Sequence, residues 1–164
     1  MRRVLTLCYH GVSDTWPARF AVPAAHIERQ VGSLLERGYV GATFRDAVAA
    51  PPADRTFAVT FDDAYRSVHE QALPVLRSLG VPATVFVPTA LVGSERPMAW
   101  PGTDKWLGSP YEDELTPMSW DELAELAELG WELGSHTRTH PHLPTLMPDD
   151  LRDELEGSRS DLEE

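Results

Sequence analysis

The stretch Thr56-Phe57-Ala58-Val59-Thr60-Phe61-Asp62-Asp63 decides the fold, because a mostly apolar run leads directly into two adjacent carboxylates. An apolar run of this length predicts a buried strand. Two neighbouring carboxylates at the mouth of such a strand are costly to desolvate unless a cation or a proton lies nearby. The stretch therefore predicts a buried strand that ends in a polar site.

A second polar cluster follows a later apolar stretch. The sequence Gly134-Ser135-His136-Thr137-Arg138-Thr139-His140 places two histidines four residues apart. On one turn of helix, these imidazoles would share a face and could bind one cation. A carboxylate with two imidazoles is typical of a metal site that leaves positions open for water and substrate. We interpret the combination as a site for metal-assisted hydrolysis, with the spare carboxylate as a base.

Simpler interpretations of the same residues remain open at this point. Aspartates that follow a strand often cap the next helix, and two histidines can be ordinary polar residues of a loop. Successive residues at a strand end point to opposite sides. One carboxylate could therefore reach a metal while the other faces the attacking water, but the alternation does not say which aspartate does which.

Strand and helix patterns alternate along the chain. We expect strands over 4–9, 56–61, 83–87 and 131–134, and helices over 24–37, 44–50, 64–79, 120–129 and 148–164. This order predicts an α/β fold with a parallel sheet and right-handed connections. In such folds functional residues collect at the C-terminal ends of the strands. The residues predicted at those ends are His10, Asp62, Asp63, Pro88 and His136.

Local signals refine this outline. The nearly continuous apolar run over 4–9 predicts a buried strand, with Cys8 as an inert core thiol. Pro74 predicts a kink within the helix over 64–79. Ser119 followed by Glu122 predicts a capping box at the start of the helix over 120–129.

The length and the net charge limit the possible functions and partners of the chain. The 164 residues predict a single domain over 1–164, and the net charge of −12 argues against nucleic acid or an anionic membrane surface as a partner. No run approaches the roughly 20 apolar residues of a membrane span, and no signal-peptide cleavage site follows the first apolar run. We therefore expect a cytoplasmic chain with no membrane span.

Further candidate residues surround the predicted site. His10 could support the site through a hydrogen bond or contact a metal or substrate directly. Tyr65 follows the aspartate pair, while Trp100 and Trp106 belong to a long irregular stretch over 88–117. With Trp120, these tryptophans could stack on a sugar, or they could simply pack in the loop and core. We therefore take His10, Tyr65, Trp100 and Trp120 as candidate substrate contacts.

The motifs together resemble the polysaccharide deacetylase family, also called the NodB-homology domain or carbohydrate esterase family four. The resemblance is carried mainly by Thr60-Phe61-Asp62-Asp63-Ala64-Tyr65 and Ser135-His136-Thr137-Arg138-Thr139-His140. Further matches are Leu7-Cys8-Tyr9-His10-Gly11-Val12, Ala72-Leu73-Pro74-Val75-Leu76, Val81-Pro82-Ala83-Thr84-Val85-Phe86-Val87, Met118-Ser119-Trp120-Asp121-Glu122-Leu123 and His140-Pro141-His142-Leu143. The resemblance covers nearly the whole chain.

The resemblance implies a distorted (β/α) barrel and a metal-dependent hydrolase that removes acetyl groups from N-acetylated sugars or polysaccharides. It implies Asp62 as the catalytic base. It also implies that Asp63, His136 and His140 bind a divalent cation, most often Zn²⁺, with Co²⁺, Ni²⁺ or Fe²⁺ in some members.

The sequence departs from the family pattern in two ways. Ala64 stands where glycine is usual, so we expect a slightly different local backbone, because alanine adopts a positive φ only at a cost. The chain also stops before the family's C-terminal motifs, so we expect an incomplete barrel with about four of seven strands. The alternatives are a non-catalytic metal- or carbohydrate-binding module, an inactive fragment that a partner chain completes, or self-association through an open sheet edge.

Overall fold

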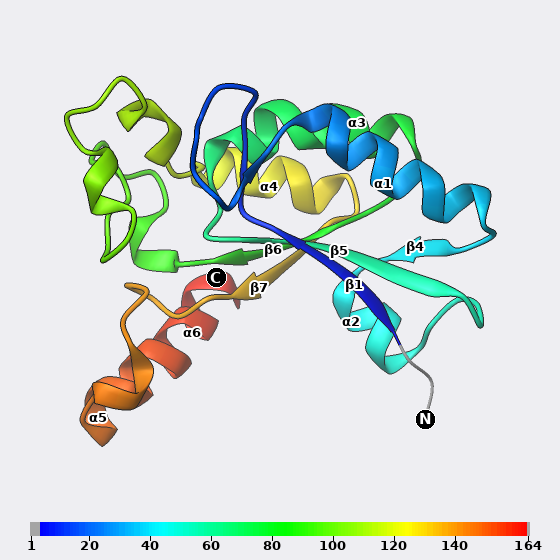
Figure 1. The fold of residues 1–164 in the computed structure, drawn as a ribbon. Coiled ribbons are helices and arrows are strands. Elements are labelled where there is room, and N and C mark those ends of the chain that lie inside the picture. Colours follow the sequence, from blue (N-terminus) through cyan, green and yellow to red (C-terminus); the bar gives the residue numbers. More distant parts are fainter. Residues whose placement is uncertain (1–3, 164) are drawn as a thin grey trace.

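The computed structural model describes residues 4–163 and contains one five-stranded parallel sheet with helices on both faces (Figure 1). Its strands are β1 (Leu5–Tyr9), β4 (Val40–Ala42), β5 (Thr56–Asp62), β6 (Thr84–Val87) and β7 (Glu132–Ser135). Two further strands, β2 (Gly11–Val12) and β3 (Ala21–Val22), form a separate parallel pair. The predicted α/β class is confirmed.

The helices form the two outer layers. They are α1 (Ala24–Glu36), α2 (Phe44–Ala49), α3 (Leu73–Ser78), α4 (Trp120–Glu128), α5 (Pro148–Arg152) and α6 (Ser158–Glu163). Helices α1, α3 and α4 lie on one side of the sheet, and α2, α5 and α6 lie on the other (Figure 1).

Strand β5 organises the sheet. It pairs with β1 along one side, from Leu5 opposite Phe57 to Tyr9 opposite Phe61. Along the other side it pairs first with β4 and then with β6, and β6 pairs with β7. All these pairings are parallel, so the C-terminal ends of β1, β5, β6 and β7 meet at one edge of the sheet.

The apolar face of β5 anchors the main core. Phe57, Val59 and Phe61 are fully buried. The Phe61 ring stacks on Trp131, with ring centroids 5.8 Å apart, and also lies against Tyr9. These contacts hold the strand that carries Asp62 at its end.

Some predicted elements differ from the structure. The three short strands β2, β3 and β4 were not predicted, because two or three residues carry no readable periodicity. The helix expected over 64–79 begins with a turn, continues as a π-helical segment over Val68–Ala72 and becomes α-helical at Leu73. Pro74 lacks an amide N–H, which explains the irregular hydrogen bonding just before it. The capping box at Ser119 is confirmed.

The prediction of a buried first strand with a core thiol was wrong. Within the described residues β1 is an outer strand of the sheet, and Leu5, Thr6 and Cys8 are exposed while Tyr9 is buried. The apolar pattern indicated a strand correctly, but burial also depends on which elements cover each face. Self-association through an outer strand stays a prediction.

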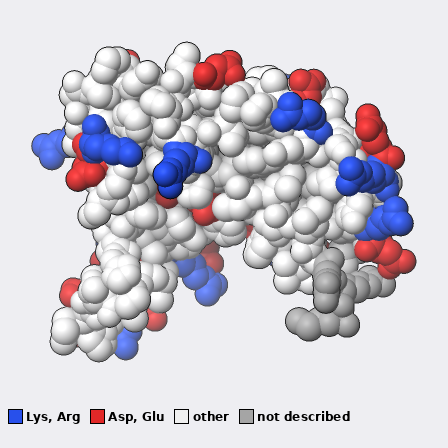
Figure 2. Space-filling model, viewed as in Figure 1, with Lys and Arg blue, Asp and Glu red and all other residues white. Residues whose placement is uncertain are grey.

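Acidic and basic side chains are interspersed over the face shown in Figure 2 rather than gathered into one basic patch. Among residues 4–163, no helix combines the length and the apolar character that crossing a bilayer requires.

Replacing Phe61 with alanine tests the anchoring of β5. Removing a fully buried ring that stacks on Trp131 should lower the free energy of unfolding by about 3–5 kcal/mol. Urea denaturation measures the change. The control is Val48→Ala on α2, where the side chain is 58% exposed, and we expect a change within about 0.5 kcal/mol. Equal destabilisation by both variants would contradict the assignment of Phe61 to the core.

Candidate functional site

Three side chains converge at the C-terminal edge of the sheet. Asp63 follows β5 and is only 4% exposed, while His136 follows β7 and His140 lies four residues further along. Asp63 Oδ1 lies 3.3 Å from His136 Nε2 and 3.4 Å from His140 Nε2. One ligand atom from each of these residues lies within 4.8 Å of the others.

The three atoms have the spacing that a metal ion requires. Tetrahedral zinc with nitrogen and oxygen ligands at 2.0–2.1 Å places those ligand atoms about 3.3 Å apart. Asp63 Oδ1 is also buried and has no hydrogen-bond partner among the described residues. A buried carboxylate oxygen that faces two ring nitrogens fits a bound divalent cation.

The two segments that carry these residues have unusual backbones. Among the described residues, the non-glycine positions with positive φ are Asp63 (74°), Ala64 (54°), Thr137 (67°) and His140 (58°). Such conformations cost free energy and cluster at functional sites. Their restriction to the two segments around the candidate ligands indicates a site that the surrounding structure holds in place.

One local expectation was wrong. His136 and His140 do not lie on a helical turn, because residues 136–141 form an irregular loop with two left-handed positions. Ala64 adopts a φ of 54°, and the expected difference from the family's backbone at this position stays a prediction. The surrounding chain stabilises this conformation, since the Met118 N–H donates to the Ala64 carbonyl at 2.9 Å.

The loop of the histidines is fixed by the C-terminal helical segment. Glu154, which is 8% exposed, accepts hydrogen bonds from the Arg138 N–H at 2.7 Å and the Thr139 N–H at 2.9 Å. Its carboxylate also accepts from the Thr139 hydroxyl. Burial alone would raise the pKa of Glu154, but these hydrogen bonds outweigh it and lower the pKa below its ordinary value. Glu154 therefore stays ionised and positions the loop.

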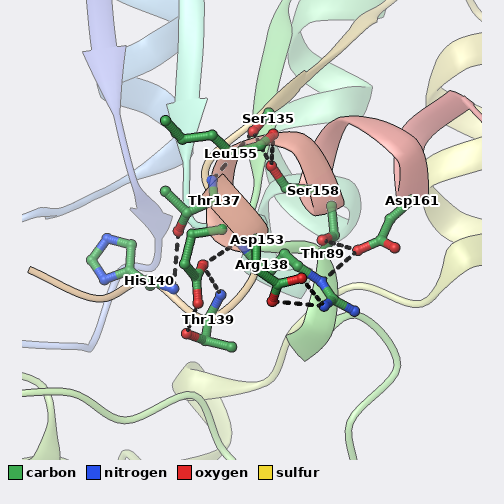
Figure 3. A network of polar contacts seen from close by, with 11 residues as sticks. Thr89, Ser135, Thr137, Arg138, Thr139, His140, Asp153, Leu155, Ser158 and Asp161 are labelled. Carbon is green, nitrogen blue, oxygen red and sulfur yellow. Dashed lines mark hydrogen bonds and ion pairs between the residues drawn. The ribbon is translucent and has the colours of Figure 1, made fainter. Parts of the chain in front are cut away.

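Further polar contacts surround this loop (Figure 3). Arg138 forms ion pairs with Asp153 at 3.1 Å and Asp161 at 3.2 Å. Asp161 also accepts a hydrogen bond from the Thr89 hydroxyl at 2.6 Å. The Thr137 hydroxyl accepts from the His140 N–H at 3.1 Å. The loop is thus tied both to the end of β6 and to α6.

Protonation differs between the two histidines. The Asp63 carboxylate raises the pKa of His136, against the opposing effect of burial. Burial lowers the pKa of His140, with the Asp63 charge acting in the opposite direction. His140 is therefore held as a neutral imidazole, the form that ligates metals.

Asp62 ends β5 beside the first strand. Its Oδ2 lies 3.8 Å from His10 Nε2 and 3.5 Å from Cys8 Sγ. Asp62 is half-buried and does not belong to the trio around Asp63 Oδ1. The two adjacent aspartates therefore have different partners, as the alternation along a strand predicts.

A pocket of about 500 Å³ opens over Asp63 and His140. Its lining includes His10, Phe20, Trp100, Trp106 and Tyr65, together with Arg19 and Lys105. The Trp100 ring lies against the His140 ring, with centroids 4.2 Å apart. A pocket of this size with aromatic walls can hold a small polar ligand such as one sugar ring.

The structure brings together three of the four candidate substrate contacts. His10, Tyr65 and Trp100 line the pocket, although Tyr65 is fully buried and its hydroxyl has no partner among the described residues. Burial raises the pKa of Tyr65, so its hydroxyl keeps its proton. Trp120 lies elsewhere, in a second pocket with Arg138 and Asp161.

Comparisons with known proteins show the family of the chain. The model of the family described as polysaccharide deacetylase matches residues 49–164. The chain belongs to the polysaccharide deacetylase family. The Bacillus subtilis (strain 168) protein YxkH, which carries a polysaccharide deacetylase name, is 27% identical over 158 residues, covering 93% of this chain and 49% of that protein.

Solved structures show the same fold. A polysaccharide deacetylase of Bacillus cereus, BC0361, is 26% identical with a TM-score of 0.76, over 98% of this chain and 46% of that one. The Streptococcus pyogenes deacetylase PplD, solved in complex with acetate, is 22% identical with a TM-score of 0.78, over 98% and 67%. The chain thus spans about half the length of YxkH and BC0361, and its sheet is a partial barrel of this family's type.

Sequence reasoning missed two residues near the site. Glu154 carried no signal beyond its acidic helix, because its partners lie about fifteen residues away in a loop. Cys8 was assigned to the core, although the expected strand alternation places it on the same side as His10. That alternation was the one signal that could have found it.

Replacing Glu154 with alanine tests its role in holding the loop. The Arg138 and Thr139 amides would lose a charged acceptor, a change typically worth about 1.5–3 kcal/mol per bond. We expect faster hydrogen exchange at these two amides, measured by NMR. The control, Glu156→Ala, removes an exposed carboxylate of the same segment and should leave both rates unchanged. Similar exchange in both variants would refute the role.

Proposed function

We propose that this chain carries the metal-binding part of a hydrolase that removes acetyl groups from N-acetylated sugars or polysaccharides. The observation that carries the proposal is the Asp63, His136 and His140 cluster, whose ligand atoms have metal spacing at a strained strand end. Family membership and the neighbouring Asp62 support the same reaction. The reaction class is hydrolysis of a non-peptide amide.

The proposed ligands are Asp63 Oδ1 and the Nε2 atoms of His136 and His140. One carboxylate and two imidazoles suit Zn²⁺, and also Co²⁺, Ni²⁺ or Fe²⁺. When bound, such an ion polarises a carbonyl group and lowers the pKa of water. The loop geometry that Glu154 maintains aims both ring nitrogens at the same carboxylate oxygen.

Asp62 is proposed as the general base. Its carboxylate lies at the end of β5, next to the proposed ligand Asp63, and would accept the proton of the attacking water. We propose that His10, whose Nε2 lies 3.8 Å from Asp62 Oδ2, orients that carboxylate. The partners of each aspartate support this division of roles, since Asp63 faces two imidazoles and Asp62 does not.

The pocket is the proposed substrate subsite. Phe20, Trp100 and Trp106 offer aromatic faces to a sugar ring, while Arg19 and Lys105 offer donors to its hydroxyl groups. Because Asp63 and His140 also line this pocket, an acetamido group of a bound sugar would reach the ligand cluster.

Replacing His140 with alanine tests the metal ligands. Loss of one of three protein ligands should remove one zinc ion per chain after dialysis, measured as zinc content by elemental analysis. The control is His142→Ala, since His142 is an exposed histidine two residues away and outside the cluster. Zinc content should match the unaltered protein in that variant. Unchanged zinc in His140→Ala would refute the ligand assignment.

Replacing Asp62 with asparagine separates the base from the ligands. In a form of the protein that releases acetate from an acetylated chitooligosaccharide, we expect a loss of about 10²–10⁴-fold in kcat. At least one zinc ion per chain should remain after dialysis, because Asp62 does not belong to the Asp63 cluster. Loss of all bound zinc would show instead that the two aspartates have exchanged roles.

A further inference from the structure

A second group of metal-ligating side chains lies beside the Asp63 cluster. Cys8 Sγ and His10 Nε2 approach the same oxygen, Asp62 Oδ2, at 3.5 and 3.8 Å. One ligand atom from each of these three residues lies within 4.8 Å of the others. None of the three belongs to the Asp63 cluster, so they form a separate set of donors.

The backbone places these donors together. Cys8 and His10 are two residues apart, so the alternation of β1 puts both side chains on one side of the sheet. Tyr9 pairs with Phe61 in the parallel ladder, which sets His10 beside Asp62 at the next step. The arrangement thus depends on two paired strands rather than on a mobile loop.

The spacing and chemistry suit a thiophilic divalent ion. Tetrahedral zinc with sulfur at 2.3 Å and oxygen at about 2.0 Å requires a separation of about 3.5 Å between these two ligands. The observed distance from Cys8 Sγ to Asp62 Oδ2 is the same, and His10 needs only a small approach. A thiolate favours zinc or cadmium over magnesium or calcium.

We propose that Cys8, His10 and Asp62 form a second cation site, which binds zinc or a similar thiophilic ion and withholds the Asp62 carboxylate while occupied. Binding replaces the thiol proton of Cys8, which passes to solvent. The exposed position of Cys8 gives the ion access. The functional consequence rests on the proposed role of Asp62: an excess of zinc should inhibit deacetylation by occupying the base.

Cadmium titration tests the site directly. Cys8 is the single cysteine of the chain, so any ultraviolet thiolate-to-cadmium charge-transfer band must arise from it. We expect the band to grow and saturate in the unaltered protein, and to be absent in Cys8→Ser. Serine replaces only the sulfur at this exposed position, and matching thermal unfolding of both proteins verifies the fold. Absence of the band in the unaltered protein would overturn the proposal.

Zinc stoichiometry separates the two sites. Equilibrium dialysis should give two ions for the unaltered protein and one for Cys8→Ser. It should also give one for His140→Ala, where the remaining ion still protects Cys8 from iodoacetamide. Loss of Cys8 should weaken the second ion at least about tenfold, because loss of even an outer partner of a ligand costs 10–100-fold. If Cys8→Ser still binds two zinc ions per chain with unchanged affinity, the second site is refuted.

An assay of acetate release at low and high zinc provides the final test. In a form of the protein that releases acetate, excess zinc should lower the rate of the unaltered protein relative to its own rate at low zinc, whereas this ratio should stay near one in Cys8→Ser. Equal inhibition of both proteins would contradict the inhibitory role. If His140→Ala keeps the full zinc content of the unaltered protein, the proposed function fails, while the cadmium band still decides the second site.

Discussion

The burial of the Asp63 carboxylate is the constraint on which the rest of the site depends. Its side chain is almost inaccessible, and Oδ1 has no hydrogen-bond partner among the described residues. An ionised carboxylate in such a position is costly unless positive charge lies close to it. The two imidazoles supply that charge only in part, because His136 has a raised pKa whereas burial keeps His140 neutral. A divalent cation among the three residues would complete the compensation, so the same atoms that look unsatisfied are those best placed to bind one.

Holding this cluster requires a backbone that local preferences oppose. Each left-handed non-glycine residue costs roughly 1–2 kcal/mol, and four of them lie in the two segments of the site. Tertiary hydrogen bonds offset this cost: Met118 donates to the Ala64 carbonyl, and Glu154 accepts from the amides of Arg138 and Thr139. The helical segment after the histidines therefore acts on the site indirectly, because it fixes the loop from which His140 projects.

The sequence was sufficient for features that depend on local patterns. Apolar runs that end in polar residues located β5 and β7, and parallel order then placed Asp63 and His136 at one edge of the sheet. Features set by distant partners were missed or misjudged. The spacing of four residues indicated a helical turn for His136 and His140, whereas tertiary contacts hold them on a loop. Likewise, the apolar pattern of β1 could not show that Cys8 lies exposed beside Asp62, because exposure depends on which elements cover that strand.

The pocket and the Asp63 cluster share side chains, because Asp63 and His140 belong to both. Trp100 lines the pocket and packs against the ring of His140, whose Nδ1 is buried without a hydrogen-bond partner among the described residues. The His140 ring is therefore held by packing against Trp100 and by the approach of its Nε2 to Asp63 Oδ1 at 3.4 Å. In metal-binding histidines a hydrogen bond to the second ring nitrogen is more usual. A ligand that stacks on Trp100 would also act on the position of the His140 ring, because the two rings are packed together. Ligand binding in the pocket and the position of the His140 ring would thus depend on the same aromatic contact.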